Sequence, residues 1–370
     1  MLALALCGGA YAVVAAVLVK RVLHRPPAPL PDPLPAVTIL KPLHGDEPGL
    51  EAALTSFLDQ SYAAPVQVVF GVRDAADPAR GVAEDIKQRF ADRDIAIVAD
   101  PQVYGPNGKI SNVINMMKCA THDVLVLADS DIAVRPDYLG AVVAALSRPG
   151  VGVVSCLYTG RGVTNLWSRL AAMGIGYQFL PNAAVGIASG MAHPCFGSTI
   201  AMRRSTLAAI GGFDAFALYL ADDFEIGRAA RAKGLVLAYP PLCVSHNSAE
   251  TSLAELAAHE LRWARTIRVI DTAGHWGSFI THALPLGLIG AVFLGFSPAA
   301  CVGLAGLLAA RLFLKARIDH IVGSSAGPAW MLPARDVLSF GLFIASLFGN
   351  AVHWRGSRLR VGKSGAMSQS

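Results

Sequence analysis

Short apolar runs alternate with longer amphipathic stretches between residue 36 and about residue 272 of the chain. A short apolar run predicts a buried strand, whereas apolar residues spaced by a helical turn predict a helix. The predicted strands are 37–40, 66–72, 95–98 and 124–128, and the predicted helices are 49–60, 78–90 and 109–120. This alternation predicts an α/β domain with a mostly parallel sheet and flanking helices, in which ligands bind beyond the carboxyl ends of the strands.

The N-terminal apolar run has the character of a membrane anchor. Residues 2–19 carry no charge and are followed by Lys20, Arg21, His24 and Arg25. A secretory signal peptide has its positive charge before the apolar core, and here the charge comes after it, so we predict an uncleaved anchor. Because basic residues favour the cytoplasmic side of a membrane, the domain after the anchor is expected to face the cytoplasm.

Further apolar stretches lie in the C-terminal part of the chain. Residues 279–296 and 297–314 are each about long enough to span a membrane. Arg311 and Lys315 mark a return to the cytoplasm, so these stretches predict a helical hairpin. A shorter stretch, 337–352, is either a third span or a re-entrant or interfacial helix.

An apolar stretch also interrupts the predicted α/β domain. Residues 166–187 have few charges but contain Gly174, Gly176 and Pro181. This pattern suits an interfacial helix that lines an entrance from a membrane, or an ordinary pair of buried helices. The predicted organisation is an anchor at 1–25, a Pro-rich linker at 26–35, an α/β domain at 36–272, a C-terminal membrane region at 273–355 and a basic tail at 356–370.

The composition indicates an integral membrane protein with one sizeable polar domain. The chain is 54% hydrophobic and 15% charged, which is more apolar than an ordinary soluble domain. Its formal net charge of +5 is modest, and the basic residues near the apolar runs suit anionic lipid headgroups better than nucleic acid. The six cysteines form no CxxC pair, which favours reduced thiols over a disulfide framework.

Two carboxylates follow the last predicted strand. Asp129 and Asp131 are one residue apart, directly after the apolar run 124–128. A buried strand that presents two carboxylates at its exposed end forms a compact oxygen-ligand site for a hard divalent cation. Taken alone, such a pair is common and usually just solvated.

Polar residues follow other predicted strands as well. Lys41 follows the first strand and Asp74 the second, although the nearby Asp77 is a candidate for nothing more than a helix cap. A turn-rich loop opens the third predicted helix, whose first turn carries Lys109 and Asn112. Backbone N–H groups and a lysine in that position suit an anionic diphosphate. An ordinary capped surface helix has the same residues.

A second acidic group lies farther along the chain. Asp222 and Asp223 precede a predicted helix, and Asp223 is the leading candidate for a general base. Asp222 and Glu225 compete for that role, and one of the acidic residues can simply cap the helix. Beyond them, Arg262 is a candidate to stabilise an anionic leaving group, and Trp263 packs either under a ligand or in the core.

The order of these motifs carries a family resemblance. The segments in question are LKPLHG, VRDAADPA, GKISNVINM, LADSDI, FGSTIAMRR, GGFDAF, LADDFEIG and HELRW. In this order the chain resembles the ceramide glucosyltransferase family, including its bacterial relatives that glycosylate hopanoid lipids. The resemblance extends over nearly the whole chain, from the N-terminal apolar run to the C-terminal WRGSRLR.

The resemblance implies a nucleotide-diphosphosugar transferase domain of the GT-A type that uses a UDP-sugar and a lipid acceptor at the cytoplasmic membrane face. Asp74 and Asp129 match the first two family aspartates, both at the donor nucleotide, and Asp223 matches the third, the catalytic base. The family's closing signature begins with Gln or Arg. Here His259 takes that place, so a permanent charge or an amide is lost, although a neutral imidazole still donates one hydrogen bond. Asp131 is absent from some family members, and its presence here favours a metal.

These observations predict a membrane-bound inverting glycosyltransferase that moves one sugar, glucose or N-acetylglucosamine, from a UDP-sugar to a hydroxyl of a hopanoid polyol or a ceramide. The expected site residues are Asp223 and Arg262 for catalysis, Lys41, Asp74, Lys109, Asn112, Asp129, His259 and Trp263 for the donor, and Asp129 and Asp131 for Mg²⁺ or Mn²⁺. The expected location is the bacterial inner membrane, with no nucleic-acid partner. Two alternatives stay open: a processive polysaccharide synthase, and a non-catalytic membrane scaffold with a sugar-nucleotide-binding domain.

Overall fold

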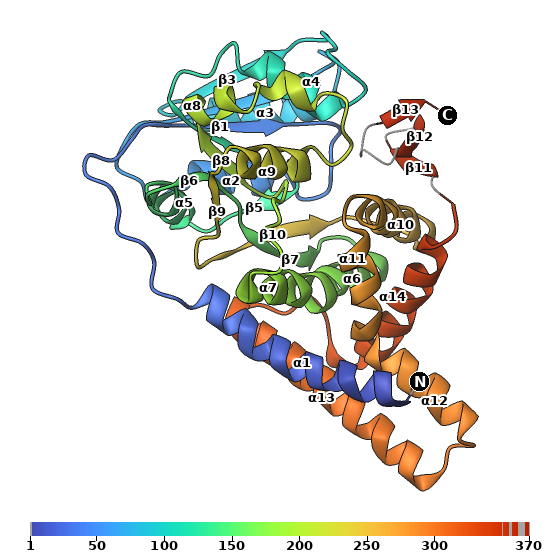
Figure 1. The fold of residues 1–370 in the computed structure, drawn as a ribbon. Coiled ribbons are helices and arrows are strands. Elements are labelled where there is room, and N and C mark those ends of the chain that lie inside the picture. Colours follow the sequence, from blue (N-terminus) through green and yellow to red (C-terminus); the bar gives the residue numbers. More distant parts are fainter. Residues whose placement is uncertain (1, 350, 355–356, 362–366, 370) are drawn as a thin grey trace. The chain divides into compact units, whose positions relative to one another are not determined.

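The computed structural model describes residues 2–349, 351–354, 357–361 and 367–369, and the chain divides into two compact units (Figure 1). The first, which we call the sheet unit, comprises Leu23–Tyr158 and Ala192–Asn247. The second, which we call the helical unit, comprises Met1–Val22, Thr159–Met191 and Ser248–Ser370. The predicted α/β range 36–272 is therefore shared between the units, because 159–191 and 248–272 belong to the helical unit.

A seven-stranded sheet forms the centre of the sheet unit, in the order β3-β2-β1-β4-β8-β6-β9. Its strands are β1 (Val37–Pro42), β2 (Val66–Val72), β3 (Asp94–Ala99), β4 (Val124–Leu127), β6 (Val151–Val154), β8 (Ile200–Arg203) and β9 (Val236–Ala238). The first four strands in that order are parallel, β8 is antiparallel to both its neighbours, and β9 is parallel to β6. The predicted mostly parallel sheet is confirmed, and each of the four predicted strands is found within two residues of its expected bounds.

Helices and short strands complete the sheet unit. The helices are α2 (Leu50–Leu58), α3 (Pro78–Arg89), α4 (Gly108–Met116), α5 (Tyr138–Leu146), α8 (Arg204–Ala209) and α9 (Asp222–Ala232), with a 3-10 turn η2 (Phe213–Phe216). Strand β5 (Ile132–Ala133) pairs antiparallel with β10 (Cys243–Ser248), and the chain leaves the unit along β7 (Leu157–Gly162). The predicted helix 109–120 is too long: α4 ends at Met116, because the next residues form a turn in which Lys118 N–H donates to Asn115 O.

The core of the sheet unit explains where its polar residues emerge. All six residues of β1 and all four of β4 are buried, as expected of central strands covered on both faces. Phe57 of α2 and Tyr138 of α5 pack edge to face in this core, with ring centroids 5.5 Å apart. Since β1 and β4 are parallel, the residues that follow them emerge together at one edge of the sheet.

The helical unit consists mainly of apolar helices. They are α1 (Leu2–Leu23), α6 (Leu166–Gly174), a π-helical turn η1 (Ile175–Phe179), α7 (Leu180–Ser189), α10 (Leu253–Ile270), α11 (Thr272–Gly277), η3 (Ser278–Thr281), α12 (Ala283–Phe293), α13 (Pro298–Val322), η4 (Ala329–Met331) and α14 (Leu332–Ser346). Strands β11 (Ala351–Trp354), β12 (Ser357–Val361) and β13 (Met367–Gln369) form a small antiparallel sheet. Parts of the predicted basic tail 356–370 lie outside the described residues.

Three helices of the described chain are long and apolar enough to cross a membrane. They are Ala3–Leu23, Leu166–Ser189 and Pro298–Val322, and a bent pair, Thr272–Thr281 with Ala283–Phe293, passes the same test as one broken segment. The predicted apolar helices near both termini are thus confirmed, and they indicate a membrane protein.

Two stretches of the predicted membrane region differ from the structure in regularity or extent. Residues 279–296 do not form one straight span, since a 57° bend separates η3 from an α12 of only 11 residues. The predicted stretch 337–352 is helical only as far as Ser346, within α14, and β11 begins at Ala351. In addition, 166–187 is more regular than expected, because a π-helical turn joins α6 and α7 into one helical stretch.

Buried charges join the helices of this unit. Arg311 of α13 and Asp336 of α14 are 4% and 5% exposed and form two parallel hydrogen bonds of 2.8 and 2.7 Å. Arg311 Nη1 also donates to the carbonyl of Tyr177 in η1. The Tyr177 hydroxyl donates to Asp319, which pairs with Lys315. Polar groups of α13 thus have partners on α14 and on η1, which helps to fix how these three elements pair.

Removing one member of the Arg311–Asp336 pair is expected to destabilise the helical unit. Asp336→Leu leaves a buried guanidinium without its counter-charge, which costs about 3–5 kcal/mol, and the midpoint of thermal unfolding in detergent should fall. Combining it with Arg311→Met removes both charges and should recover most of the loss. As a control, Arg135→Met breaks an exposed pair with Asp137 and should cost at most about 1 kcal/mol. Equal midpoints for Asp336→Leu and Arg135→Met would contradict the assigned role.

Candidate functional site

The turn after β4 carries the two predicted metal-ligating carboxylates. The carbonyl of Asp129 accepts the backbone N–H of Ile132, which closes the turn. The backbone N–H of Asp129 donates to Gly197 O. Asp131 Oδ2 lies 3.2 Å from His246 Nε2, on β10, and between the two aspartates the Ser130 hydroxyl donates to Glu47. The turn is thus fixed by contacts to three separate segments.

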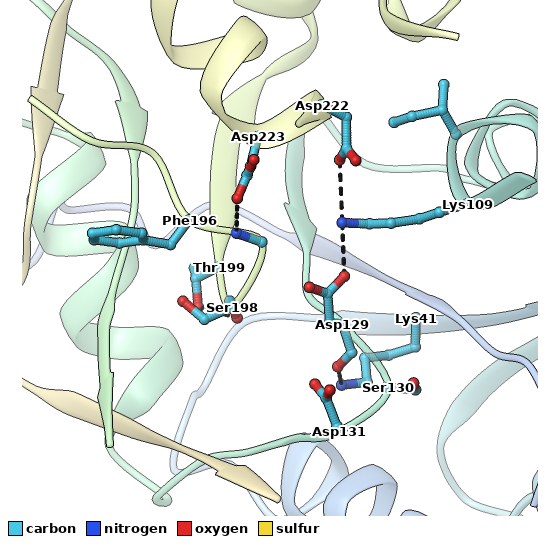
Figure 2. Close-up of polar contacts among 12 residues, drawn as sticks. Lys41, Lys109, Asp129, Ser130, Asp131, Phe196, Ser198, Thr199, Asp222 and Asp223 are labelled. Atoms are coloured by element: carbon cyan, nitrogen blue, oxygen red, sulfur yellow. Dashed lines mark hydrogen bonds and ion pairs between the residues drawn. The ribbon is translucent and has the colours of Figure 1, made fainter. Parts of the chain in front are cut away.

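Lys41 supports this turn from below (Figure 2). The side chain is completely buried, its Nζ donates to Asp129 O at 2.5 Å and to Ile132 O at 3.4 Å, and it lies 4.0 Å from the centre of the Phe57 ring. Burial lowers the pKa of Lys41 to about 7, against the opposing effect of the Asp131 and Asp129 carboxylates. Lys41 is one of the predicted donor residues, and its amine donates to two backbone carbonyls.

Lys109 lies between two carboxylates. Its Nζ is 2.7 Å from Asp129 Oδ1 and 3.1 Å from Asp222 Oδ2, and the side chain is 14% exposed (Figure 2). Burial by itself lowers the pKa of Lys109, but the Asp129 and Asp222 carboxylates outweigh it and raise that pKa above its usual range. The lysine is therefore a permanent cation at the centre of the acidic group.

Asn107 explains why Lys109 is in this place. Its side-chain oxygen accepts the backbone N–H groups of Lys109 and Ile110, which caps α4. Its amide nitrogen donates to Tyr219 O and to Asp222 Oδ1. One buried asparagine thus starts the helix and aligns it with the second acidic group.

Asp223 differs from its acidic neighbours in what surrounds it. Its Oδ2 accepts the Gly197 N–H at 2.9 Å, and its Oδ1 accepts the N–H of Phe224 at 2.7 Å. Burial and the Asp222 carboxylate raise the pKa of Asp223 to about 6. Asp222 is held by Lys109, and Glu225 is buried and paired with Arg228 at 2.5 Å. Of the three carboxylates, Asp223 is the one without a cationic side chain paired to it among the described contacts.

Gly197 is the meeting point of the two acidic groups. Its carbonyl accepts the Asp129 N–H, while its own N–H donates to Asp223. A Cβ on this residue would lie 2.4 Å from Asp129 Oδ2 and 3.2 Å from Lys109 Nζ. Gly197 reaches this place because β8 runs antiparallel to β4, so the segment before β8 lies beside the residues that follow β4.

The sequence did not single out Gly197, Asn107 or His246. Gly197 stood inside the FGSTIAMRR motif, but nothing in that motif distinguished it from a turn glycine. Asn107 had a local signal as a helix cap, whereas its bonds to Tyr219 and Asp222 span more than one hundred residues. His246 lies on a strand that only the folded chain brings to Asp131.

The remaining predicted donor residues of the sheet unit are Asp74, which follows β2, and Asn112, on α4. Asp74 is exposed, and its Oδ1 accepts the N–H of Ala76 at 2.9 Å. Asp77 caps α3, as its alternative role predicted. Asn112 is buried and its amide donates to Gly71 O at 2.7 Å, so this amide supports the strand end.

His259, Arg262 and Trp263 lie on α10, in the helical unit. His259 Nδ1 is 2.6 Å from Glu250 Oε1, and the His259 and Trp263 rings meet edge to face with centroids 4.4 Å apart. The carbonyl of Arg262 accepts the hydroxyl of Thr266 one turn later. The structure thus groups these three residues on one helix, within a different unit from Asp129 and Asp223.

The residues present fit a hard divalent cation as a two-carboxylate set. The side chains of Asp129 and Asp131 are 36% and 30% exposed on the same turn. Within the described ranges, no group of three or more His, Cys, Asp and Glu side chains is placed to hold an ion. Because Mg²⁺ commonly takes one or two carboxylates and completes its shell with phosphate oxygens and water, this turn suits an ion that arrives with an anionic ligand.

A known protein family matches the chain along almost its whole length. The sequence model described as Glycosyl transferase family 21 matches residues 1–367. The ceramide glucosyltransferase of Komagataella phaffii is 30% identical over 135 residues, covering 35% of this chain and 26% of that protein. Ceramide glucosyltransferase 1 of Caenorhabditis elegans is 24% identical over 237 residues, covering 64% of this chain and 50% of that protein. The chain thus spans half or less of the length of these curated relatives.

Solved structures resemble the chain in fold, and a mannosyltransferase is one of them. The mannosyltransferase PcManGT from Pyrobaculum calidifontis, in complex with GDP-Man and Mn²⁺, superposes with a TM-score of 0.52 over 85% of this chain and 98% of that chain, at 19% sequence identity. At such low identity the similarity shows the fold alone. The predicted GT-A type fold is therefore confirmed.

Gly197→Ala is expected to weaken cation binding at the turn after β4. The added Cβ would displace the Asp129 carboxylate, so the Mn²⁺ affinity, measured by electron paramagnetic resonance, should fall by about tenfold or more, or about 1.4 kcal/mol. Gly81→Ala is the matched control, since a Cβ there meets open space within α3. It should leave the Mn²⁺ affinity unchanged and stabilise the fold by about 0.5–1 kcal/mol. Equal Mn²⁺ affinities for the two variants would argue against the close approach of Gly197 and Asp129.

Proposed function

This chain belongs to glycosyl transferase family 21, and from that membership we propose that it is a membrane-bound inverting glycosyltransferase acting on a lipid. It would transfer one sugar, glucose or N-acetylglucosamine, from a UDP-sugar to a hydroxyl of a hopanoid polyol or a ceramide. The curated relatives named above are ceramide glucosyltransferases, and the apolar helices of this chain give a lipid acceptor a route to the protein.

One observation carries the proposal. Gly197 donates its N–H to Asp223 and accepts the N–H of Asp129 on its carbonyl. The carboxylate suited to take a proton, and the backbone of the aspartate suited to hold a donor diphosphate through a cation, are thus both hydrogen-bonded to one glycine. A transferase needs these two functions on either side of one reacting carbon.

The donor side of the site would be formed by the residues around Asp129. Asp129 and Asp131 would hold a divalent cation, which supplies charge neutralisation for the leaving diphosphate when it is bound. Lys109 lies close enough to Asp129 to donate to the same diphosphate, and Asp74 would accept hydrogen bonds from the ribose or base. Lys41 and Asn112 would act by positioning, since their amine and amide groups hold backbone carbonyls.

Residues of α10 would contribute to the same donor. The guanidinium of Arg262 would stabilise the charge that develops on the diphosphate. Trp263 would pack against the sugar or the loop that carries the diphosphate. His259 is oriented by Glu250 and touches the Trp263 ring, so it would hold that indole in place.

The acceptor side would be centred on Asp223. As the acceptor oxygen forms its bond to the anomeric carbon, its proton passes to Asp223, and the bond from that carbon to the diphosphate oxygen breaks to release UDP. A single displacement inverts the anomeric centre, so an α-linked donor gives a β-glycoside. The basic residues after the first apolar run support the proposal that this reaction takes place at the cytoplasmic face of the bacterial inner membrane.

The direct test is UDP release by the detergent-purified protein with Mg²⁺ or Mn²⁺. UDP-glucose and UDP-N-acetylglucosamine are each supplied with a hopanoid polyol or with ceramide, and product mass is measured. We expect acceptor-dependent release with one donor and addition of a single sugar. Products carrying many sugars would instead establish a processive synthase, and donor binding without release from any pair would favour a scaffold.

Asp223→Asn is expected to abolish transfer while donor binding is retained. Loss of a general base costs about 10²–10⁴-fold in rate. Glu225→Gln is the control, because Glu225 is paired with Arg228, and it should keep most of the activity. Normal transfer by the Asp223 variant would show that another group accepts the proton.

The pH dependence of the transfer rate provides a separate test of Asp223 as the general base. Because burial and Asp222 raise the pKa of Asp223 to about 6, the base is protonated below that pH and ionised above it. The rate at low donor and acceptor concentration should therefore rise with pH through about 6 and then level off. A rate unchanged between pH 5 and pH 7, measured at the same low donor and acceptor concentrations with the cation in excess, would contradict Asp223 as the base.

A further inference from the structure

The Lys109 ammonium is paired with the Asp129 carboxylate, which a divalent cation needs as a ligand. Its distance to Asp129 Oδ1 is 2.7 Å, and Figure 2 shows it in line between Asp129 and Asp222. The other Asp129 oxygen, Oδ2, lies over Gly197, so close that a Cβ there would be at 2.4 Å. A cation that approaches the Asp129 carboxylate therefore finds Oδ1 in an ion pair with Lys109 and Oδ2 close to the backbone of Gly197.

The ammonium also repels a second cation at short range. Opposite charges at hydrogen-bond distance stabilise each other strongly where water is scarce, and like charges repel to a similar extent. Lys109 is mostly buried, so solvent screens this repulsion only weakly. A divalent ion cannot bind Asp129 at full strength while the ammonium stays on Oδ1.

Asp222 is a second partner that can hold the Lys109 ammonium when it moves away from Asp129. Asp222 is 5% exposed and its other oxygen is fixed by Asn107, which is completely buried. The ammonium has three N–H groups, so it can keep its ion pair with Asp222 while the ion pair with Asp129 is exchanged for another acceptor. A diphosphate arriving at the start of α4 supplies such an acceptor, and the helix N-terminus favours it.

We propose that Lys109 is a resident counter-ion that blocks Asp129 to divalent cations until a nucleoside diphosphate draws its ammonium away. Cation and nucleotide then bind cooperatively, because each removes an obstacle to the other. This rests on the proposed function for the identity of the nucleotide. The competition between Lys109 and the cation for Asp129 does not depend on it.

The test measures Mn²⁺ binding to the full-length protein in detergent by electron paramagnetic resonance, with and without UDP. Lys109→Met is compared with the wild type and with Lys118→Met, which removes an exposed lysine paired with Asp100. Without UDP, we expect Lys109→Met to bind Mn²⁺ about tenfold more tightly than the other two proteins. UDP should tighten Mn²⁺ binding about tenfold in the wild type and in Lys118→Met, and by less in Lys109→Met.

A double variant keeps the test valid if Lys109→Met fails to fold. Combining it with Asp222→Asn removes the carboxylate that the missing lysine leaves unpaired, and leaves Asp129 and Asp131 intact. Mn²⁺ affinity without UDP that is equal to or weaker than that of the wild type, in the folded variant, would overturn the competition. Unchanged Mn²⁺ affinity in the presence of bound UDP would overturn the cooperativity. If UDP does not bind the wild type, the donor assignment fails, and the comparison of Mn²⁺ affinities without nucleotide still decides the competition.

Discussion

Four carboxylates share a small space at one edge of the sheet, and their mutual repulsion is the constraint to which the surrounding residues respond. Asp129 and Asp222 are bridged by Lys109, Asp131 lies against His246, and Asp223 is bound by two backbone N–H groups. Without such partners, like charges at this separation and burial would shift their protonation or unfold the site. The ammonium of Lys109 and the peptide of Gly197 are therefore as necessary to the site as the carboxylates themselves.

The topology of the sheet brings these partners to one edge with little additional structure. Parallel β1 and β4 deliver Lys41 and Asp129 to the same edge. The antiparallel β8 enters at that edge, so Gly197 arrives there without a long loop. Helix α9 begins at Asp222, where the acidic residues also interact favourably with the helix dipole. One reversal of strand direction thus joins the two acidic groups.

The sequence predicted those parts of the fold that depend on local patterns. Apolar runs of strand length gave β1, β2, β3 and β4, and the carboxylates after β4 and before α9 stood out by position. The bond network of Gly197, the contact of His246 with Asp131 and the burial of Lys41 depend on segments far apart in the chain, so no local pattern carries them. A lysine after a strand has the same appearance whether it faces a ligand or a backbone carbonyl.

The helical unit shows the same division between local and distant information. Hydropathy located α1 and α13, because an apolar helix of that length needs no partner to be recognised. Hydropathy did not locate the bend before α12 or the end of α14, because turns and buried charges determine the structure at those two places. Asp336 and Arg335 lie within an otherwise apolar stretch, and their partners on α13 and α10 make that tolerable.

The π-helical turn at Ile175–Phe179 restricts how this family member can change in length. It accommodates a wider turn within the run from α6 to α7, and the carbonyl of Tyr177 within it accepts Arg311. An ordinary α-helix with the same number of residues here would rotate all of α7 by about 100°. Asn182, which accepts the hydroxyl of Tyr11, would then face another direction. Insertions and deletions should therefore be tolerated in the loops that flank this run and selected against within it.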